Sequence, residues 1–277
     1  MIVQREMSAI AIQFIDDPAD PRVAAYRDIR ERDLTGREGL FVAEGEVVIR
    51  TLLSSASLCR ARSLLIAANR LEAQGELVAA AGEAPVYAAS QAVMDAIAGF
   101  PLHRGLLALG EKPVERTVAE TLADLPEACV VLVCAGIGNH DNMGGLFRNA
   151  AAFGAAAVLR DERCCDPFYR KAIRVSVGAV LRTPSARAVS LEQLIVALQA
   201  ARFEVVALSP GATEPLAGLT GGGRNAILVG SEGPGLPSEI MARVRTVGIP
   251  MAGGFDSLNV AVTSALALYH VTTVSIR

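Results

Sequence analysis

The sequence predicts an α/β protein in which a small N-terminal domain precedes a larger domain built on a parallel sheet. Strand-like and helix-like segments alternate along the chain, which is typical of parallel strands joined by helical crossovers. The run CVVLVCAGI, residues 129–137, is continuously apolar, as expected for a strand buried on both faces. Hydrophobic residues make up 52% of the 277 and charged residues 20%, which favours a sizeable core over disorder.

The N-terminal domain is predicted to cover residues 1–112. Residues 1–20 show no clear periodicity and are predicted to be a loose arm, whereas residues 21–37 alternate charged with apolar side chains, as on a solvated helix. Strands are then expected at LFVAEG, ARSLLIAA, PVYAAS and GLLALG, which are residues 40–45, 61–68, 85–90 and 105–110. Helices are expected at EVVIRTLLSS and QAVMDAIAG, residues 46–55 and 91–99.

The second domain is predicted to cover residues 129–277. The stretch 111–128 is charged and contains two prolines, and residues 113–128 are predicted to be a linker that carries a short helix. After the buried strand at 129–137, further strands are expected at AAVLRD, EVVALSP, NAILVGSEG and RTVGIPM, residues 156–161, 204–210, 225–233 and 245–251. Helices are expected at LEQLIVALQAARF, residues 191–203, and at the C-terminal end.

Composition limits the partners and cofactors that the chain is expected to have. The net charge of −3 means that any contact with RNA must come from a local basic patch. Five cysteines occur without a CxxC pair, so neither a metal site nor a disulfide scaffold is expected. The apolar stretch 257–276 contains Asn259, Ser264 and His270, and it is better explained as a buried helix than as a membrane span. No signal peptide is evident, and a cytoplasmic protein is predicted.

Two nucleotide-binding motifs are tested first and rejected. Gly136-x-Gly138 follows the strand at 129–137, but Asp141 stands where a dinucleotide-binding fingerprint needs a third small residue. A GxxxxGK[ST] phosphate loop does not occur in the sequence.

The stretch DNMGGLFRNAAAFGA, residues 141–155, is the first of three unusual segments. Asp141 and Asn142 are predicted to cap a helix whose core stripe is formed by Leu146, Ala150, Phe153 and Ala157.

Arg148 is the cation of this helix. It lies two positions after Leu146, about 200° around the axis, and therefore points away from the core. Ala151 and Ala152 leave space beside its guanidinium. A surface arginine without a ligand is the alternative interpretation.

The second segment is LVGSEGPGLP, residues 228–237, which contains three glycines and two prolines and directly follows a predicted buried strand. Glycines permit positive φ and let a ligand approach the backbone. Its one charge is Glu232. The alternative is a plain loop into a helix near Pro237, in which Glu232 binds backbone amides.

The third segment is IPMAGGFDSLNVAVTSALALYH, residues 249–270. A strand ends at Ile249 and Pro250, and Ser257 is predicted to cap the last helix, whose first amides form an anion-friendly end. Small residues would allow another helix or chain to approach closely, namely Ala261, Ser264 and Ala265. The alternative is a C-terminal helix that merely packs.

Together and in this order, the three segments resemble the motifs of the SpoU (TrmH-type) RNA ribose methyltransferases of the SPOUT superfamily. The motif residues in this sequence are Asn142-x-Gly144-x-x-x-Arg148, then Gly230-Ser231-Glu232-Gly233-Pro234-Gly235-Leu236, then Ile249-Pro250-Met251 and Ser257-Leu258-Asn259-Val260. DPFYRKAIRVSVGAVLRTP, residues 166–184, also resembles the family segment between the first two motifs. The resemblance covers residues 129–275.

The resemblance implies a parallel sheet with helices on both faces and a deep trefoil knot threaded by residues 205–275. It also implies that the knotted loops bind S-adenosylmethionine in a bent shape. The residues carried over as cofactor contacts are Gly230, Ile249 and Leu258 through backbone groups, with Leu208, Ser209, Ser231, Gly233 and Met251 beside them.

The N-terminal domain resembles the substrate-binding module of a subset of the family, which is similar to small ribosomal RNA-binding proteins. LFVAEGEVVIRTLL matches its opening strand and helix. The segment HRGLLALG departs from the pattern, because Arg104 stands where the family usually has glutamine. Members with this module often act on ribosomal RNA and those without it on transfer RNA, so ribosomal RNA is the expected partner.

Methylation of a ribose 2′-hydroxyl requires that the hydroxyl be held in line with the sulfonium methyl and lose its proton. The resemblance assigns proton removal to Arg148. A guanidinium is essentially always protonated, so the alternative is that Arg148 clamps an RNA phosphate and holds the developing alkoxide. The residues that would orient the arginine and the ribose are Asn142, Glu232, Ser257 and Asn259. Family members are dimers whose sites use both chains, so a homodimer is expected.

Two other function classes stay open. A non-catalytic module of the same fold would bind RNA or S-adenosylmethionine without reaction, but the intact set Asn142, Arg148, Glu232 and Asn259 favours an enzyme. A nicotinamide oxidoreductase is the more distant alternative.

Overall fold

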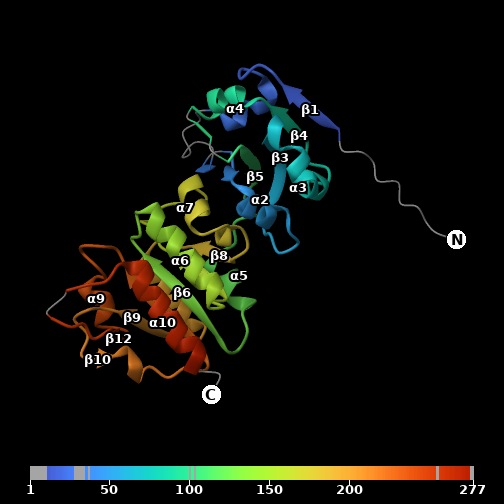
Figure 1. Ribbon diagram of the computed structural model, residues 1–277. Helices are drawn as coiled ribbons and strands as arrows, with labels where there is room; N and C mark the ends of the chain where they lie inside the picture. Colours follow the sequence, from blue (N-terminus) through green and yellow to red (C-terminus); the bar gives the residue numbers. More distant parts are fainter. Residues whose placement is uncertain are drawn as a thin grey trace. The chain divides into compact units, whose positions relative to one another are not determined.

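The computed structural model describes residues 11–27, 35–36, 38–99, 101–102, 104–253 and 256–274. The chain divides into two compact units, Met1–Pro113 and Val114–Arg277 (Figure 1). Each unit has its own sheet and its own core, and each is considered separately below.

The first unit contains a five-stranded sheet in the order β1-β4-β3-β5-β2. Its strands are β1 Ile12–Ile15, β2 Leu40–Glu44, β3 Arg60–Ala67, β4 Val86–Ala89 and β5 Leu106–Glu111. Its helices are η1 Pro21–Tyr26, α2 Glu46–Leu53, η2 Ala68–Arg70, η3 Glu72–Gln74, α3 Gly75–Ala80 and α4 Gln91–Ala98. β5 runs antiparallel to β2 and β3, whereas β1 and β3 are both parallel to β4. The four predicted strands and two predicted helices of this part are confirmed.

The prediction of a loose arm over residues 1–20 is wrong for β1. Ile12 to Ile15 pair in parallel register with Val86 to Ala89, and Ile15 is buried in the core. The pairing partner lies more than 70 residues away in the sequence, so local periodicity over four residues could not reveal it. Residues 1–10 lie outside the described part of the chain.

The helix expected over residues 21–37 is also partly wrong. The described part forms the short 3₁₀ helix η1, which Asp20 caps by accepting a hydrogen bond from the amide of Arg22 at 2.8 Å. Tyr26 at its end is buried, donates to the carbonyl of Ser63 at 2.9 Å, and accepts from the amide of Leu109 at 3.0 Å. Burial raises the pKa of this phenol. Residues 28–34 and 37 lie outside the described residues.

The second unit contains a seven-stranded sheet in the order β10-β12-β9-β11-β6-β7-β8, and all its strand pairs are parallel. The strands are β6 Cys129–Ala135, β7 Ala157–Arg160, β8 Ser185–Arg187, β9 Glu204–Leu208, β10 Glu214–Pro215, β11 Arg224–Gly230 and β12 Arg245–Gly248. The helices are α5 Val118–Ala123, α6 His140–Ala152, α7 Arg170–Val175, η4 Ala179–Leu181, α8 Leu191–Ala200, η5 Leu216–Gly218, α9 Ser238–Met241 and α10 Val260–Val274. The predicted parallel sheet is confirmed, although the short elements α7, β8 and β10 were not expected.

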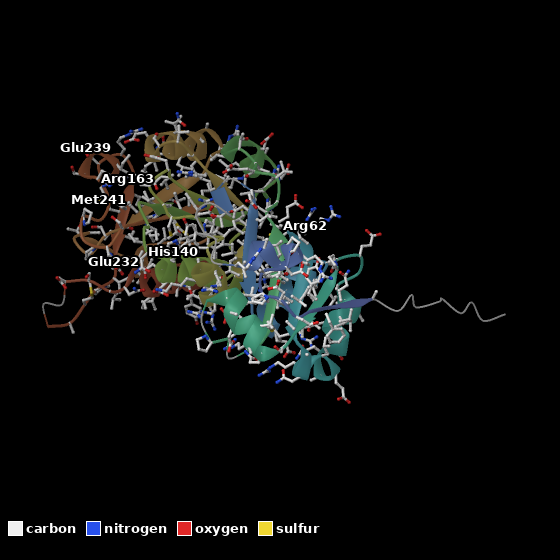
Figure 2. The ribbon with its side chains drawn as sticks, turned by 90° about the horizontal axis from the view of Figure 1, so that it is seen from above. Arg62, His140, Arg163, Glu232, Glu239 and Met241 are labelled. Atoms are coloured by element: carbon white, nitrogen blue, oxygen red, sulfur yellow. The ribbon has the colours of Figure 1, made fainter. Side chains whose placement is uncertain are left out.

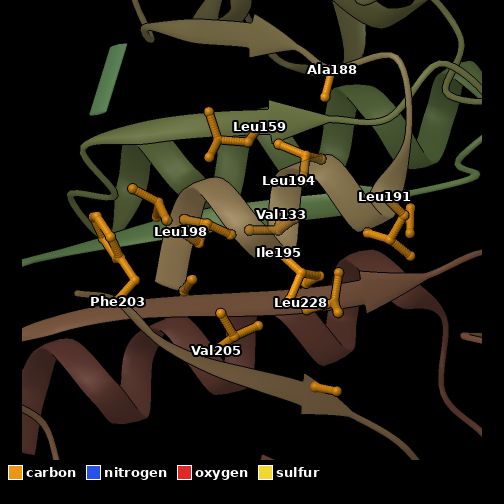
Figure 3. Packing of buried hydrophobic residues seen from close by; sticks show 14 of the residues in the cluster. Val133, Leu159, Ala188, Leu191, Leu194, Ile195, Leu198, Phe203, Val205 and Leu228 are labelled. Atoms are coloured by element: carbon orange, nitrogen blue, oxygen red, sulfur yellow. The ribbon is translucent and has the colours of Figure 1, made fainter. Parts of the chain in front are cut away.

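One face of this sheet packs against α8. The apolar face of that helix contributes Leu191, Leu194, Ile195 and Leu198, which lie over Val133, Leu159 and Leu228 of the strands (Figure 3). Successive strand residues point to opposite faces, so Leu132 and Cys134 of β6 face the other side, where α6 and α10 lie. The continuous apolar run at 129–135 therefore reflects a strand that is buried on both faces.

The segment 113–128, predicted to be a linker, carries the expected short helix, α5. Thr117 caps it, with a reciprocal hydrogen bond between the Thr117 amide and Glu120 at 2.8 Å. Leu122 of α5 is buried in the same core as α8. From Val114 onward this segment therefore belongs to the second compact unit.

Helices α6 and α10 pack at very close range on the other face. A Cβ built on Gly145 would lie 2.8 Å from the Cβ of Ala261, and one on Gly144 would lie 2.7 Å from the carbonyl oxygen of Ala172 in α7. Asn149 donates to the carbonyl of Ala261 at 2.6 Å and to the hydroxyl of Ser264 at 3.0 Å. The small residues of the last helix thus contact a helix of the same chain.

The last helix is 15 residues long, and among the described residues no helix is long and apolar enough to cross a membrane. The prediction that it is a buried helix is only half right, because Val262, Leu266 and Tyr269 are exposed on its outer side. The knot that the family resemblance implies stays a prediction.

The close contact between α6 and α10 makes a testable prediction for Gly145→Ala. The added methyl must push Ala261 away, so we expect the free energy of unfolding to fall by about 1–3 kcal/mol in urea unfolding experiments. Gly138→Ala is the matched control, because a Cβ at Gly138 would meet nothing within 4 Å. Equal stability of the two variants would contradict the packing argument.

Candidate functional site

The loops that follow β9, β11 and β12 line a cleft of about 750 Å³ in the second unit. Parallel strands present their carboxyl ends at one edge of a sheet, which is where open α/β sheets bind ligands. Every residue predicted to contact a cofactor lines this cleft: Leu208, Ser209, Gly230, Ser231, Gly233, Ile249, Met251 and Leu258. Glu232, Ser257 and Asn259 also line it.

Several lining residues were missed by the sequence prediction. They are Pro210, Val229, Pro234, Gly235, Leu236, Met241, Val247, Asp256, Val260 and Thr263. Pro234, Gly235, Leu236 and Val260 belong to the motifs but were not assigned to the site. Met241 comes from α9, and only the fold brings it to the same cleft as Glu232 (both are labelled in Figure 2).

The loop after β11 is closed on itself at Gly230. A Cβ built on Gly230 would lie 2.7 Å from the carbonyl carbon of Gly235 and 2.8 Å from the amide of Leu236, so no side chain fits there. The amide of Gly235 donates to the carbonyl of Ser231 at 3.2 Å, and Gly233 and Gly235 have φ of +86° and +65°. These glycines give a tight turn that carries Glu232 on its exposed tip.

A polar cluster joins the three motif segments. The side-chain amide of Asn259 donates to Oδ1 of Asn142 at 2.9 Å and to Oε1 of Glu232 at 3.1 Å. Asn142 is only 7% exposed, whereas Glu232 is exposed at the cleft. The alternative in which Glu232 binds backbone amides does not apply, because its carboxylate accepts from the Asn259 side chain and from no backbone amide of the described residues. Residues more than 100 positions apart in the sequence therefore meet in one hydrogen-bonded group.

Both predicted helix caps are wrong, and the physical reason is a shift of the helix start. Helix α6 begins at His140, and its cap is Asn139, which accepts from the amides of Asp141 at 2.7 Å and Asn142 at 3.4 Å. Asp141 instead pairs with Lys171 at 2.6 Å. The shift places Asn142 inside the helix, where its side chain faces Asn259.

The cap of α10 is Asn259 rather than Ser257. Oδ1 of Asn259 accepts from the amides of Ala261 at 2.9 Å and Val262 at 3.4 Å. Ser257 lies two residues before the cap and lines the cleft. The oxygen of the Asn259 carboxamide thus caps the last helix, and its nitrogen donates to Asn142 and Glu232 of the other two motifs.

Arg148 is exposed on α6, as the helical spacing predicts. The buried stripe consists of Met143, Leu146, Phe147 and Ala150. The predicted stripe was wrong at its end: α6 stops at Ala152, so Phe153 is the residue after the helix and Ala157 belongs to β7.

The guanidinium of Arg148 makes no hydrogen bond or ion pair with any residue in the described ranges. Nor does Arg148 line the cleft. The structure therefore brings Asn142, Glu232 and Asn259 together but leaves Arg148 outside their hydrogen-bonded group.

Hydrogen bonds from residues of the loop after β7 fix the turn between β6 and α6. Asp161, 3% exposed, accepts from the amide of Gly136 at 3.0 Å, and the thiol sulfur of Cys164 accepts from the amide of Ile137 at 3.3 Å. The amide of Cys165 donates to the carbonyl of Ile137 at 2.8 Å. Sequence reasoning missed Asp161, because a single acid at a strand end has no distinctive spacing.

Burial makes the two thiols of this loop poor nucleophiles. It raises the pKa of Cys164 to about 12 and that of Cys165 to about 11. Both side chains are therefore protonated at neutral pH, in keeping with the interpretation of the cysteines as reduced, mostly apolar residues.

Comparisons with known proteins identify relatives of this chain. The family described as SpoU rRNA Methylase matches residues 129–269. An uncharacterized tRNA/rRNA methyltransferase of Mycobacterium tuberculosis strain H37Rv is 38% identical over 274 residues, covering 94% of this chain and 92% of that protein.

Two solved structures are similar over both units. The AdoMet-bound rRNA methyltransferase from Sinorhizobium meliloti has a TM-score of 0.77 at 24% identity and covers 95% of this chain and 98% of its own. An RNA 2′-O ribose methyltransferase has a TM-score of 0.77 at 26% identity and covers 96% of this chain and 100% of its own. The α/β fold predicted from the sequence matches theirs.

The hydrogen bond between Asn142 and Asn259 predicts energetic coupling between the two side chains. In urea unfolding, the double variant Asn142→Ala with Asn259→Ala should lose about 1 kcal/mol less than the sum of the single variants. Asn142→Ala combined with Asn225→Ala is the control, because Asn225 binds the carbonyl of Gly222 at the opposite end of β11. Additive losses in the first pair would show that the two side chains do not interact.

Proposed function

The chain belongs to the SpoU rRNA methylase family, and we propose that this RNA methyltransferase methylates a ribose 2′-hydroxyl, in ribosomal RNA rather than transfer RNA. The observation that carries the proposal is the hydrogen-bonded group Asn142, Asn259 and Glu232 beside a ligand-sized cleft. Its three members come from the three motifs that resemble the ribose-methylating branch. The similar solved structure, which is that of an RNA 2′-O ribose methyltransferase, supports the choice of acceptor.

The methyl donor of the family is S-adenosylmethionine, which supplies an activated methyl group when bound. The cleft fits such a group, because about 750 Å³ lies within the range of small-molecule sites. Gly230 offers bare backbone at the cleft wall, where the tight turn leaves no room for a Cβ. The residues that would hold the donor are Leu208, Ser209, Gly230, Ser231, Gly233, Ile249, Met251 and Leu258.

We assign to Arg148 the role of a clamp for an RNA phosphate and for the oxygen that loses its proton. A guanidinium is a permanent cation with paired donors, which suits a phosphodiester or a developing alkoxide better than it suits proton abstraction. The exposed position of Arg148 leaves its donors available to a substrate. Asn142, Asn259, Glu232 and Ser257 would orient the ribose, and Asn259 also fixes the carboxylate of Glu232.

The preference for ribosomal RNA rests on the first unit. Its strand β2 and helix α2 lie in the segment that resembles the RNA-binding module of family members that act on ribosomal RNA. The rRNA methyltransferase from Sinorhizobium meliloti, which has a similar fold, matches 95% of this chain and so includes a counterpart of this unit.

We also propose that the active form is a homodimer built on α10. Val262, Leu266 and Tyr269 are 49%, 43% and 57% exposed and follow one another at helical spacing, so they form an apolar ridge on the outer side of the helix. The ring of Phe153, at the end of α6, lies 6.0 Å from that of Tyr269 and extends the ridge toward the helix of Arg148. A second copy on this ridge would come close to the C-terminal end of α6, the helix that carries Arg148.

Arg148→Ala should separate catalysis from binding. We expect methyl transfer from labelled S-adenosylmethionine to bulk RNA to fall by about 10² to 10³, because one preorganised charge donor is lost. Affinity for S-adenosylhomocysteine should hardly change, since Arg148 lies outside the cleft. Arg148→Lys keeps the charge without the planar fork and should retain partial activity.

Arg116→Ala is the matched control, because Arg116 is an exposed arginine of the same unit whose ion pair with Asp124 contributes little stability. Near-normal turnover of Arg148→Ala with saturating RNA would remove Arg148 from the mechanism. Cofactor binding by the wild-type protein without any methyl transfer would instead favour the non-catalytic alternative.

The ridge on α10 predicts the effect of a buried charge on assembly. Leu266→Glu should convert a dimer into a monomer in analytical ultracentrifugation, because a desolvated carboxylate without a partner is costly at an interface. Val196→Glu is the control, since Val196 is an exposed valine on α8 at the other face of the sheet. A wild-type monomer, or a Leu266→Glu protein that still dimerises, would refute this interface.

A further inference from the structure

Two glycines with positive φ lie side by side at one end of the sheet in the first unit. Gly45 joins β2 to α2 with φ of +92°, and Gly105 precedes β5 with φ of +57°. The amide of Gly45 donates to the carbonyl of Leu106 at 3.1 Å, and the amide of Ala67 donates to the carbonyl of Gly105 at 2.9 Å. These bonds fix the backbone of three neighbouring strand ends in one place.

An arginine packs against each glycine. A Cβ built on Gly45 would lie 3.1 Å from Nη1 and 3.4 Å from Cδ of Arg104, and one on Gly105 would lie 3.3 Å from Cδ and 3.4 Å from Nε of Arg70. The two arginine side chains therefore occupy space that a side chain at Gly45 or Gly105 would otherwise fill. The result is a surface with two cations close to bare backbone, which we call the double-arginine surface (Arg70, Arg104, Gly45 and Gly105).

The electrostatics of this surface favour an anion. Helix α2 starts at Gly45 without a side-chain cap, so its first amides contribute partial positive charge there. The acid of its first turn, Glu46, is already engaged by Arg50 at 3.0 Å and by Gln74 at 3.4 Å. Arg104 itself forms no ion pair with a residue of the described ranges. The positive charge of Arg104 is thus left for a ligand.

We propose that the double-arginine surface binds the phosphodiester backbone of the RNA substrate, with Arg104 as the main contact. The inference rests on the proposed function, and it adds the location on the first unit at which the RNA backbone binds. Paired N–H donors match phosphate oxygens, and a chain of net charge −3 needs such a local basic patch to approach a polyanion.

The test is RNA binding by the full chain carrying Arg104→Gln. The probe is fluorescein-labelled fragments of deproteinised bacterial ribosomal RNA, measured by fluorescence anisotropy over a series of KCl concentrations. We expect affinity to fall about tenfold and the slope of log K against log salt to lessen by about one. Arg104→Lys should keep the salt slope and lose part of the affinity, because the charge remains without the fork.

Arg60→Gln is the matched control, because Arg60 is an exposed arginine at the opposite end of β3 in the same unit. It should bind the probe like the wild type. Unchanged affinity or unchanged salt slope for Arg104→Gln, or an equal loss for Arg60→Gln, would overturn the proposal.

Calorimetry with S-adenosylhomocysteine separates this proposal from the proposed function. Arg104→Gln should bind the cofactor product as tightly as the wild type and should unfold at the same temperature, because Arg104 is exposed and distant in sequence from the cleft loops. If the wild type binds S-adenosylhomocysteine and methylates RNA while Arg104→Gln binds RNA normally, only the double-arginine surface is refuted. If the wild type does neither, the proposed function itself is refuted.

Discussion

The carboxamide of Asn259 is the interaction on which the candidate site depends. Its oxygen caps α10, and its nitrogen binds Asn142 on α6 and Glu232 on the loop after β11. An aspartate would keep the acceptor and lose the donor, and a serine is shorter than either. The residue therefore fixes where the last helix begins and, by the same side chain, where the two other motif segments stand relative to it.

The close packing of α6 on α10 and α7 sets the direction of the remaining side chains. Gly144 and Gly145 let both neighbouring helices approach, and Asn149 adds hydrogen bonds to α10. With two sides occupied by helices and a third by the sheet, the outer ridge of α6 is left for Arg148. A permanent cation remains there without a partner among the described residues, which is the arrangement expected of a group that meets an anionic substrate.

Much of the fold followed from local pattern, and the misses have physical causes. The apolar run that begins at Cys129 predicted the interior strand β6 correctly, because a strand buried on both faces needs no alternation. The strand β1 was missed because its four residues gain their stability from pairing with β4 far along the chain. Both helix caps were misplaced because several polar residues precede each helix, and only the backbone geometry selects Asn139 and Asn259 among them.

The sequence by itself determined the α/β class, the parallel sheet and the segments that line the cleft, because glycine-rich loops behind buried strands leave a local signature. Only the tertiary structure decided that Asn142, Glu232 and Asn259 meet, that Asp161 holds the turn at Gly136, and that Arg104 lies against Gly45. Such contacts join residues tens to over a hundred positions apart. Periodicity carries no information about them, since they arise from the order of strands in each sheet and from how closely the helices pack.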